Sequence, residues 1–287
     1  MKRSVVKLPP GVVWLASYPK SGNTWLRVLL ANLLADGDGP QDINALDLPF
    51  RVASHRRSLD DLSLLDSDLL RHDEVERLRA LTHDAFAAEQ ASAVFVKTHD
   101  AYTLLDDGTP ILGRRARAAV HLVRDPRDVA VSYAFHCDFS FARSIAVMGD
   151  PANILTGYRH AQTPQRLLDW SGHVNSWLDQ VDVPIHVVRY EDLLADTVGE
   201  FARALAFLGI EADAGAVARA VRHASFAELQ AQEKDADFVE RAGSAPFFRE
   251  GRSGAWRRHL TLDDVRSIEG AHGATMERLG YQRETMS

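Results

Sequence analysis

The hydrophobic positions of this chain alternate between short apolar runs and helical stripes. Four apolar runs have the composition of buried strands: 12–17 (VVWLAS), 93–97 (AVFVK), 119–123 (AVHLV) and 184–190 (PIHVVRY). The first is followed by a turn and then by a stripe with the spacing of a helix packed on a sheet, Leu26, Leu29, Leu30, Leu33 and Leu34. Apolar strands that alternate with helices predict an α/β fold, with a central parallel sheet flanked by helices.

Three further stripes predict helices within 167–181, 198–208 and 262–279, and we expect Trp170 and Trp177 to pack in the core. Val198 is expected to face inward in the second of these helices. The segments 36–49 and 138–164 contain helix breakers and are predicted to be irregular. No repeat or linker is evident, so we predict a single domain over residues 1–287.

The segment 51–93 is more polar, with a weak helical stripe of Val75, Leu78, Leu81 and Ala85. Charged residues surround this stripe, and the simplest interpretation places them on a solvated surface: Arg71, Asp73, Glu74, Glu76, Arg77 and Arg79.

Composition narrows the class of partner. A net charge of −7 argues against nucleic acid and anionic membranes, which need broad basic faces, but it allows a local pocket for a small anion. The single cysteine, Cys137, excludes an intrachain disulfide and favours a reducing compartment; we expect it to pack in a helix. No apolar run has the length of a signal peptide or membrane span. We therefore predict a cytoplasmic protein, either a monomer or a homodimer.

The stretch SYPKSGNTW, residues 17–25, joins the first strand to the first helix through a tight turn. Free backbone N–H groups and the helix dipole make such a junction an anion site, to which Lys20 adds a positive charge. The usual nucleoside-triphosphate loop has its lysine after the second glycine and then Ser or Thr. Here Lys20 precedes Gly22, and Asn23 and Thr24 follow it.

Other polar residues follow the remaining strands. Lys97-Thr98-His99 ends the second, Arg124 follows the third, and Tyr190 ends the fourth. Because ligands of parallel sheets bind outside the carboxyl ends of the strands, we expect these residues to share one site. From the residues alone, His99 is one of twelve histidines, and Arg124 has an alternative interpretation as a partner of a nearby aspartate, Asp125 or Asp128.

Taken together, SYPKSGNTW, KTH, RDPRDVAVS, RYEDL and FFREGRSGAW resemble the PAPS-dependent sulfotransferases, cytosolic type, in a bacterial-like small-molecule branch (PAPS is 3′-phosphoadenosine 5′-phosphosulfate). The resemblance covers residues 12 to about 261 and implies a P-loop NTPase-like sulfotransferase fold. It implies that His99 is the catalytic base, that Lys20 and Lys97 assist catalysis, and that no metal is needed. The cofactor-binding residues that it implies are Lys20, Ser21, Gly22, Asn23, Thr24, Trp25, Arg124, Ser132, Tyr190, Phe226, Phe248, Arg249, Glu250 and Gly251.

In this resemblance Arg124 and Ser132 bind the 3′-phosphate, and Trp25 and Phe226 enclose the adenine. The chain departs from the family in three places. Glu250 stands where a lysine is usual, with Arg252 as a candidate for compensation, and Ala224 replaces a threonine. The family's dimer motif is only partly matched by Arg257, Thr261-Leu262 and Arg266.

The implied reaction is in-line transfer of the sulfuryl group from PAPS to a phenolic or alcoholic hydroxyl of a small molecule. The nucleotide product is PAP, which is 3′,5′-ADP. Two alternatives remain at this stage: a kinase-like enzyme with Asp125 as its magnesium ligand, and a non-catalytic nucleotide-binding protein. The acceptor pocket is expected within 40–91 and 138–164, which match no known pattern. Four aromatic residues in or near the second segment suit either an apolar or aromatic acceptor or the core: Phe135, Phe139, Phe141 and Tyr158.

Overall fold

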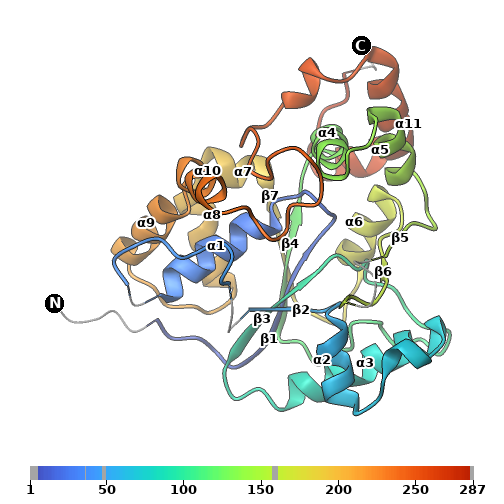
Figure 1. Ribbon diagram of the computed structural model, residues 1–287, viewed down its shortest axis with the longest axis vertical. Coiled ribbons are helices and arrows are strands. Elements are labelled where there is room, and N and C mark those ends of the chain that lie inside the picture. The colour runs from blue at the N-terminus through green and yellow to red at the C-terminus, as the bar shows by residue number, and fades with distance from the viewer. Residues whose placement is uncertain (1–5, 36, 47–49, 157–160, 285–287) are drawn as a thin grey trace.

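A computed structural model describes residues 6–35, 37–46, 50–156 and 161–284. Its centre is a five-stranded parallel sheet of order β2-β3-β1-β4-β7 (Figure 1). The strands are β1 (Gly11–Ser17), β2 (Phe50–Val52), β3 (Ala93–Thr98), β4 (Ala118–Val123) and β7 (Ile185–Arg189). The predicted fold class is confirmed, and the four predicted strands are all present. The edge strand β2 was not predicted, because three residues are too few to establish a period.

Strand β1 lies at the middle of the sheet, between β3 and β4. Its alternate side chains point to opposite faces, so Val13 and Leu15 join one hydrophobic cluster while Trp14 and Ala16 join another. Both sets are buried, which explains why the strand is apolar throughout.

Helices of the first cluster cover one face of the sheet (Figure 1). They are α1 (Asn23–Leu34), α8 (Thr197–Phe207), α9 (Ala214–His223) and α10 (Phe226–Asp235). Phe201 and Leu205 of α8 are buried against the sheet as predicted. Val198 is 46% exposed, contrary to prediction, because it lies in the first turn, beyond the edge of the packed face.

The other face is covered by α3 (His72–Ala88) and α6 (Trp170–Asp179), preceded in the chain by α2 (Arg56–Ser63) and the short η1 (Ser67–Leu69). Trp170 and Trp177 are fully buried, as predicted. The solvated surface predicted for the charges of α3 is wrong for Glu76 and Arg79. Both are buried, because Arg166 pairs with Glu76 and Asp100 pairs with Arg79.

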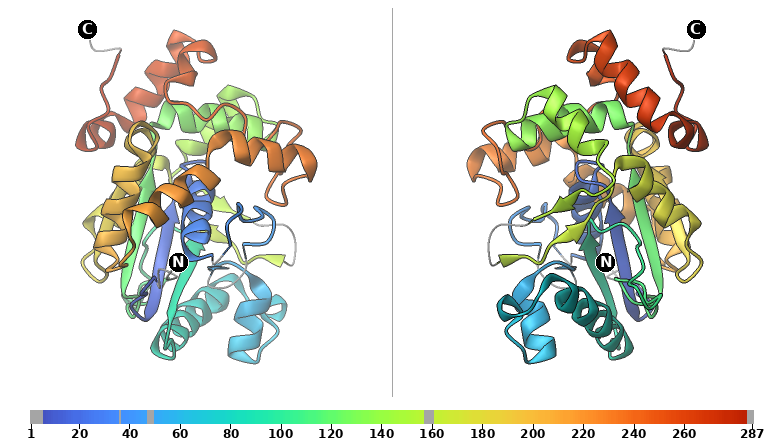
Figure 2. Two further views of the ribbon diagram at one scale, coloured as in Figure 1. Left: turned by 90° about the vertical axis from the view of Figure 1, so that its left-hand side faces the viewer. Right: turned by 90° about the vertical axis from the view of Figure 1, so that its right-hand side faces the viewer.

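The remaining elements lie around the end of the sheet where the strands finish (Figure 2). They are α4 (Pro126–Cys137), α5 (Phe141–Met148), α7 (Tyr190–Ala195), η3 (Ala255–Arg258), α11 (Leu262–Arg278) and the hairpin of β5 (Ile154–Leu155) and β6 (Gln165–Arg166). The segment 138–164 is therefore not irregular throughout, since Ser140 caps α5 by accepting from the backbone N–H of Arg143. Residues 36 and 47–49 of the other segment predicted to be irregular lie outside the described residues.

No described helix combines the length and the apolar character that crossing a bilayer requires.

Candidate active site

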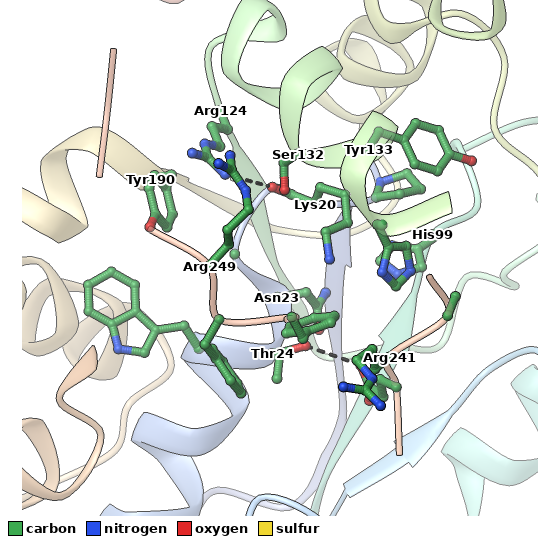
Figure 3. Close-up of a pocket in the computed structure, with 18 of the residues that line it drawn as sticks. Lys20, Asn23, Thr24, His99, Arg124, Ser132, Tyr133, Tyr190, Arg241 and Arg249 are labelled. Carbon is green, nitrogen blue, oxygen red and sulfur yellow. Dashed lines mark hydrogen bonds between the residues drawn. The ribbon is translucent and has the colours of Figure 1, made fainter. Parts of the chain in front are cut away.

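One cavity of about 560 Å³ opens at the carboxyl ends of the strands (Figure 3). Its walls come from the β1–α1 loop, the end of β3, α4, the start of α7 and the segment 239–255. Of the residues predicted from the sequence, Ser21 alone is not in the cavity lining, and its fully buried Oγ has no hydrogen-bond partner among the described residues. The cavity brings together Lys20, Gly22, Asn23, Thr24, Trp25, Lys97, His99, Arg124, Ser132, Tyr190, Phe226, Phe248, Arg249, Glu250 and Gly251.

The β1–α1 loop has the geometry of an anion site. Lys20 and Gly22 both have positive φ, 68° and 104°, which turns the chain sharply before α1. A Cβ on Gly22 would come within 2.8 Å of the Tyr190 ring, so only glycine fits there. Asn23 ties the loop to β1 by donating from Nδ2 to the Leu15 carbonyl at 2.8 Å. No described side chain caps the first turn of α1, so its N–H groups face the cavity end of the helix without a side-chain acceptor.

Lys20 projects into this cavity, with Nζ 3.6 Å from the centre of the Phe247 ring. Burial lowers its pKa from 10.5 to about 7; Glu240 acts in the opposite direction, and the positive charges of Lys97 and Arg124 lower the pKa further. A buried lysine under these conditions carries its full charge only when an anion lies beside it.

Lys97 forms an ion pair with an acidic residue, Glu240, that was not predicted from the sequence. Its Nζ donates to Glu240 at 2.9 Å, and the same carboxylate accepts from Thr24 Oγ1 at 3.1 Å and from Arg27 at 2.6 Å. The two positive charges hold the pKa of Glu240 well below its usual range despite burial. Glu240 is 216 residues from Thr24 in the chain, so no local pattern indicated that they meet.

His99 lies at the same end of the cavity, where hydrogen bonds from its ring and from its backbone hold it. Its Nδ1 donates to the Ser17 carbonyl at 2.8 Å, which leaves the lone pair of the neutral imidazole on Nε2. Its backbone N–H donates to Gln165 Oε1 at 3.0 Å. Burial, reinforced by the charge of Lys97, lowers the pKa of His99 to about 3, so the ring is neutral at physiological pH.

Arg124 lies at the opposite end, near Ser132 and Arg249 (Figure 3). It donates to the carbonyls of Lys20 at 3.3 Å and Arg252 at 3.1 Å, and its buried Nε has no hydrogen-bond partner among the described residues. Its guanidinium stacks 4.3 Å from the centre of the Tyr190 ring.

The alternative in which Arg124 pairs with a neighbouring aspartate is not supported by these contacts. Asp125 pairs with Arg127 at 2.7 Å, and Asp128 accepts from the backbone N–H groups of Gly254 and Trp256 at 2.7 and 3.0 Å. Arg124, which lines the cavity, is therefore left with backbone carbonyls as its hydrogen-bond partners.

The segment after Phe248 places positively charged arginines and the negatively charged Glu250 in the cavity lining. Arg249 and Glu250 form an ion pair, and Glu250 also pairs with Arg258 and, at 3.0 Å, with Arg252. Since Arg252 is committed to Glu250, the structure gives no support to the idea that its side chain replaces the missing lysine. A carboxylate cannot donate to a phosphate, so any contribution of Glu250 to anion binding comes from its backbone.

Trp25 and Phe226 both line the cavity. Trp25 donates from Nε1 to the Ala224 carbonyl at 2.9 Å, which fixes the orientation of its ring, and packs edge-on against Tyr190. Ala224, which replaces the expected threonine, thus contributes through its backbone. A Cβ on Gly251 would lie 2.4 Å from the Phe226 ring, so the glycine allows the loop to lie against that ring.

The cavity lining also includes residues for which sequence reasoning gave no signal: Ser54, His136, Thr156, Gln162, Gln165, Glu240 and Arg241. Of the aromatic residues suggested for an acceptor, Phe135, Phe139 and Phe141 are not in the lining, whereas Tyr158 lies outside the described residues. Phe135 packs against Phe141 instead. Cys137 lines the cavity at the end of α4.

Comparison with protein families is decisive for identity. The family model described as "Sulfotransferase domain" matches residues 10–280. The chain belongs to the sulfotransferase family. This result confirms the resemblance found in the sequence and the enzyme class that it implies.

Curated relatives of this sulfotransferase include sulfotransferase 1E1 of Cavia porcellus, 25% identical over 88% of this chain and 79% of the relative. Sulfotransferase 1A1 of Canis lupus familiaris is 25% identical over 96% of this chain and 87% of the relative. A solved retinol dehydratase, in complex with androsterone and the inactive cofactor PAP, is similar in fold with a TM-score of 0.61. It is 21% identical and covers 96% of this chain and 83% of its own.

The kinase-like alternative loses its support in this sulfotransferase. Asp125, its candidate magnesium ligand, caps α4 and is committed to Arg127, whose Nε and Nη2 both donate to the carboxylate. An acid held in this way serves the helix terminus and the ion pair rather than a metal.

Proposed function

We propose that this sulfotransferase transfers the sulfuryl group of PAPS to a hydroxyl of a small-molecule acceptor, with His99 as the general base. The observation that carries the proposal is the state of His99: a neutral ring, oriented by the Ser17 carbonyl, at the end of a cavity that also holds Lys20 and Lys97. A base must be unprotonated and within reach of the acceptor's proton, and both conditions are met when the acceptor lies beside Nε2.

PAPS is the cofactor, and it supplies an activated sulfuryl group on a phosphate leaving group. Structural neighbours of this chain contain its product form, PAP. The residues suit it chemically: the β1–α1 loop offers N–H groups to the 5′-phosphate, and Trp25 and Phe226 offer aromatic faces to the adenine. Arg124, whose side-chain hydrogen bonds go to backbone carbonyls and not to a carboxylate, joins Ser132 and Arg249 at the 3′-phosphate.

Lys20 and Lys97 serve the leaving group. Negative charge accumulates on the bridging oxygen as the sulfur–oxygen bond breaks, and preorganised ammonium groups stabilise such charge most effectively in a buried site. The lowered pKa of Lys20 is consistent with this role, since the anionic cofactor would restore its charge.

A phenolic or alcoholic acceptor fits the proposal best. The region around His99 combines apolar Val52 and Leu155 with polar Ser54 and Gln165, which suits a small organic molecule bearing a hydroxyl. Retinol and androsterone, both alcohols, are present in complexes of the similar retinol dehydratase.

Radiolabelled PAPS, incubated with a panel of phenols, steroids, sugars, amines and tyrosine peptides, tests the reaction. With the best acceptor, His99→Ala should lower kcat by about 10²–10⁴-fold, the usual contribution of a general base, while 3′,5′-ADP binds with nearly unchanged affinity. Retention of more than about a tenth of wild-type kcat would mean that His99 is not the base. If no acceptor on the panel is labelled by the wild-type protein, the non-catalytic alternative is favoured.

A further inference from the structure

A buried arginine of helix α3, Arg79, forms an ion pair with Asp100, which follows β3 in the chain. Arg79 and Asp100 are 1% and 0% exposed. Arg79 Nη2 donates to Asp100 Oδ2 at 2.5 Å and Nη1 to Oδ1 at 3.3 Å, a bidentate pair, while Nη1 also donates to the Pro164 carbonyl at 2.9 Å. An arginine that the sequence places on a solvated surface is thus among the most buried side chains of the molecule.

Such burial needs a reason, because removing two charges from water offsets much of their mutual attraction, and apolar residues of similar size often stabilise a core as well. What an ion pair adds is a defined geometry. Both oxygens of Asp100 have further donors, Thr98 Oγ1 at 3.2 Å and the Arg166 backbone N–H at 3.0 Å. The carboxylate is therefore fixed in position from several directions.

These contacts surround the residue that precedes Asp100 in the chain, His99. The His99 carbonyl accepts from His173 Nε2 at 3.2 Å, and the Asp100 carbonyl accepts from Trp177 Nε1 at 3.0 Å. The His99 N–H donates to Gln165, the neighbour of Arg166 in β6. Helix α6 and strand β6 thus hold three consecutive peptide groups, Thr98–His99, His99–Asp100 and Asp100–Ala101, while α3 holds the Asp100 side chain (Figure 1).

We propose that Arg79 and Asp100 are positioning residues for the reaction: their ion pair fixes the backbone that carries His99, and so the distance of its Nε2 from the acceptor. The inference rests on the proposed role of His99 as the base. Neither residue of the pair is in the cavity lining, so neither touches the cofactor or the acceptor. A misplacement of the base by about 1 Å is enough to lower a rate about 10²-fold.

The pair should act on turnover and not on cofactor binding. The cofactor groups proposed above come from the β1–α1 loop, the start of α1, Arg124, α4, Phe226 of α10 and the 239–255 segment. Among the described residues, the pair has no hydrogen bond to these groups, whereas the base comes from the chain directly beside it. Loosening the pair therefore affects kcat and leaves the affinity for 3′,5′-ADP close to that of the wild type.

Asp100→Asn is the direct test, because it keeps the shape of the side chain and removes its charge. We expect kcat to fall at least about tenfold, with the dissociation constant of 3′,5′-ADP unchanged within about twofold. Arg79→Lys is the milder variant: it keeps the charge and removes the bidentate fork, and should give a smaller loss of kcat in the same direction.

Glu269→Gln is the matched control. Glu269 is equally buried and accepts from Arg127 Nη1 at 2.7 Å, but it lies on α11 and is not in the cavity lining. This control should lower the melting temperature in the same way as Asp100→Asn without its loss of kcat. Combination with His99→Ala adds a readout that a general loss of stability would not give. If the pair acts through His99, Asp100→Asn has no further effect on the residual rate of His99→Ala.

The outcomes separate the two proposals. Wild-type kcat in both pair variants, or a further loss in the combined variant equal to that of Asp100→Asn alone, overturns the positioning role. So does loss of 3′,5′-ADP binding in both variants while Glu269→Gln retains it, because the pair would then be a general stabilising element. A nearly active His99→Ala enzyme overturns the base itself, and with it the proposed mechanism.

Discussion

Two buried bases, Lys20 and His99, lie in the candidate active site, and burial lowers the pKa of both, to about 7 and about 3. Both pKa values are lowered, but the consequences for the two side chains differ. His99 becomes neutral over the whole physiological range, which is the state that a general base requires. Lys20 becomes partly neutral near pH 7, so its charge depends on the anion beside it.

Because the pKa of Lys20 is lowered in the free protein, we predict that the protein takes up a proton when the cofactor product binds. At pH 8, one unit above a pKa of about 7, Lys20 is mostly neutral in the free protein, and an adjacent phosphate restores its charge. Calorimetry of 3′,5′-ADP at pH 8, in two buffers of different ionisation enthalpy, should show a net uptake of protons, and the affinity should fall between pH 7 and 9.

Lys20→Arg is the control for this measurement, because an arginine keeps its charge throughout this range. The variant should bind without proton uptake and with little dependence on pH. Binding by the wild-type protein at pH 8 without any proton uptake would contradict the assignment of Lys20 to the anion site.

At the scale of elements, the segment between α10 and η3 determines what the anion site contains. It carries Glu240, which accepts from Thr24 and Lys97, and it is tied to α4 through Asp128, which accepts from the N–H groups of Gly254 and Trp256. A carboxylate in contact with two candidate ligands of the cofactor competes with the phosphosulfate for the same donors.

Glu240→Gln should therefore strengthen 3′,5′-ADP binding, by about tenfold or more, equivalent to ~1.4 kcal/mol. Removal of the charge also leaves Arg27 without its ionic partner, so the melting temperature should fall. Isothermal calorimetry and thermal unfolding measure the two effects separately.

Glu228→Gln is a suitable control for Glu240→Gln, since Glu228 lies on α10 and is not in the cavity lining. It removes the same charge and should leave the affinity unchanged. Weaker 3′,5′-ADP binding by Glu240→Gln would show that Glu240 supports Lys97 instead of competing with the cofactor.

At the scale of the whole molecule, the elements that extend over several turns or strand residues were predictable from the sequence. The stripe from Leu26 to Leu34 has a clear helical period, and the apolar run around Trp14 is continuous, as in a strand buried on both faces; the structure contains α1 and β1 there. Strand β2 has three residues and gave no such signal, and the burial of Arg79 depends on Asp100, with which it shares no local pattern.

The residues of the candidate site also fall into a predictable and an unpredictable group. Most of the residues that a short motif carries, such as Lys20, His99 and Arg124, were predictable and meet in one cavity. Glu240, Ser54 and Gln165 belong to no motif, and only the packing of the 239–255 segment, β2 and β6 brings them to it. The acceptor region proposed around His99 includes Ser54 and Gln165, which lie in such segments, and this is why the sequence does not specify the acceptor.

The central claim, that this chain uses a 3′-phosphorylated cofactor, is tested most directly by comparing 3′,5′-ADP with 5′-AMP in calorimetry. Hydrogen bonds to charged groups contribute about 1.5–3 kcal/mol each, so Arg124 and Arg249 should favour 3′,5′-ADP by about 3–6 kcal/mol, or ~10²–10⁴-fold. The ion pair of Arg249 with Glu250 shifts the expectation toward the lower end. In Arg124→Ala the preference should shrink while the affinity for 5′-AMP stays nearly constant. Equal affinities of the wild-type protein for the two nucleotides would contradict the account.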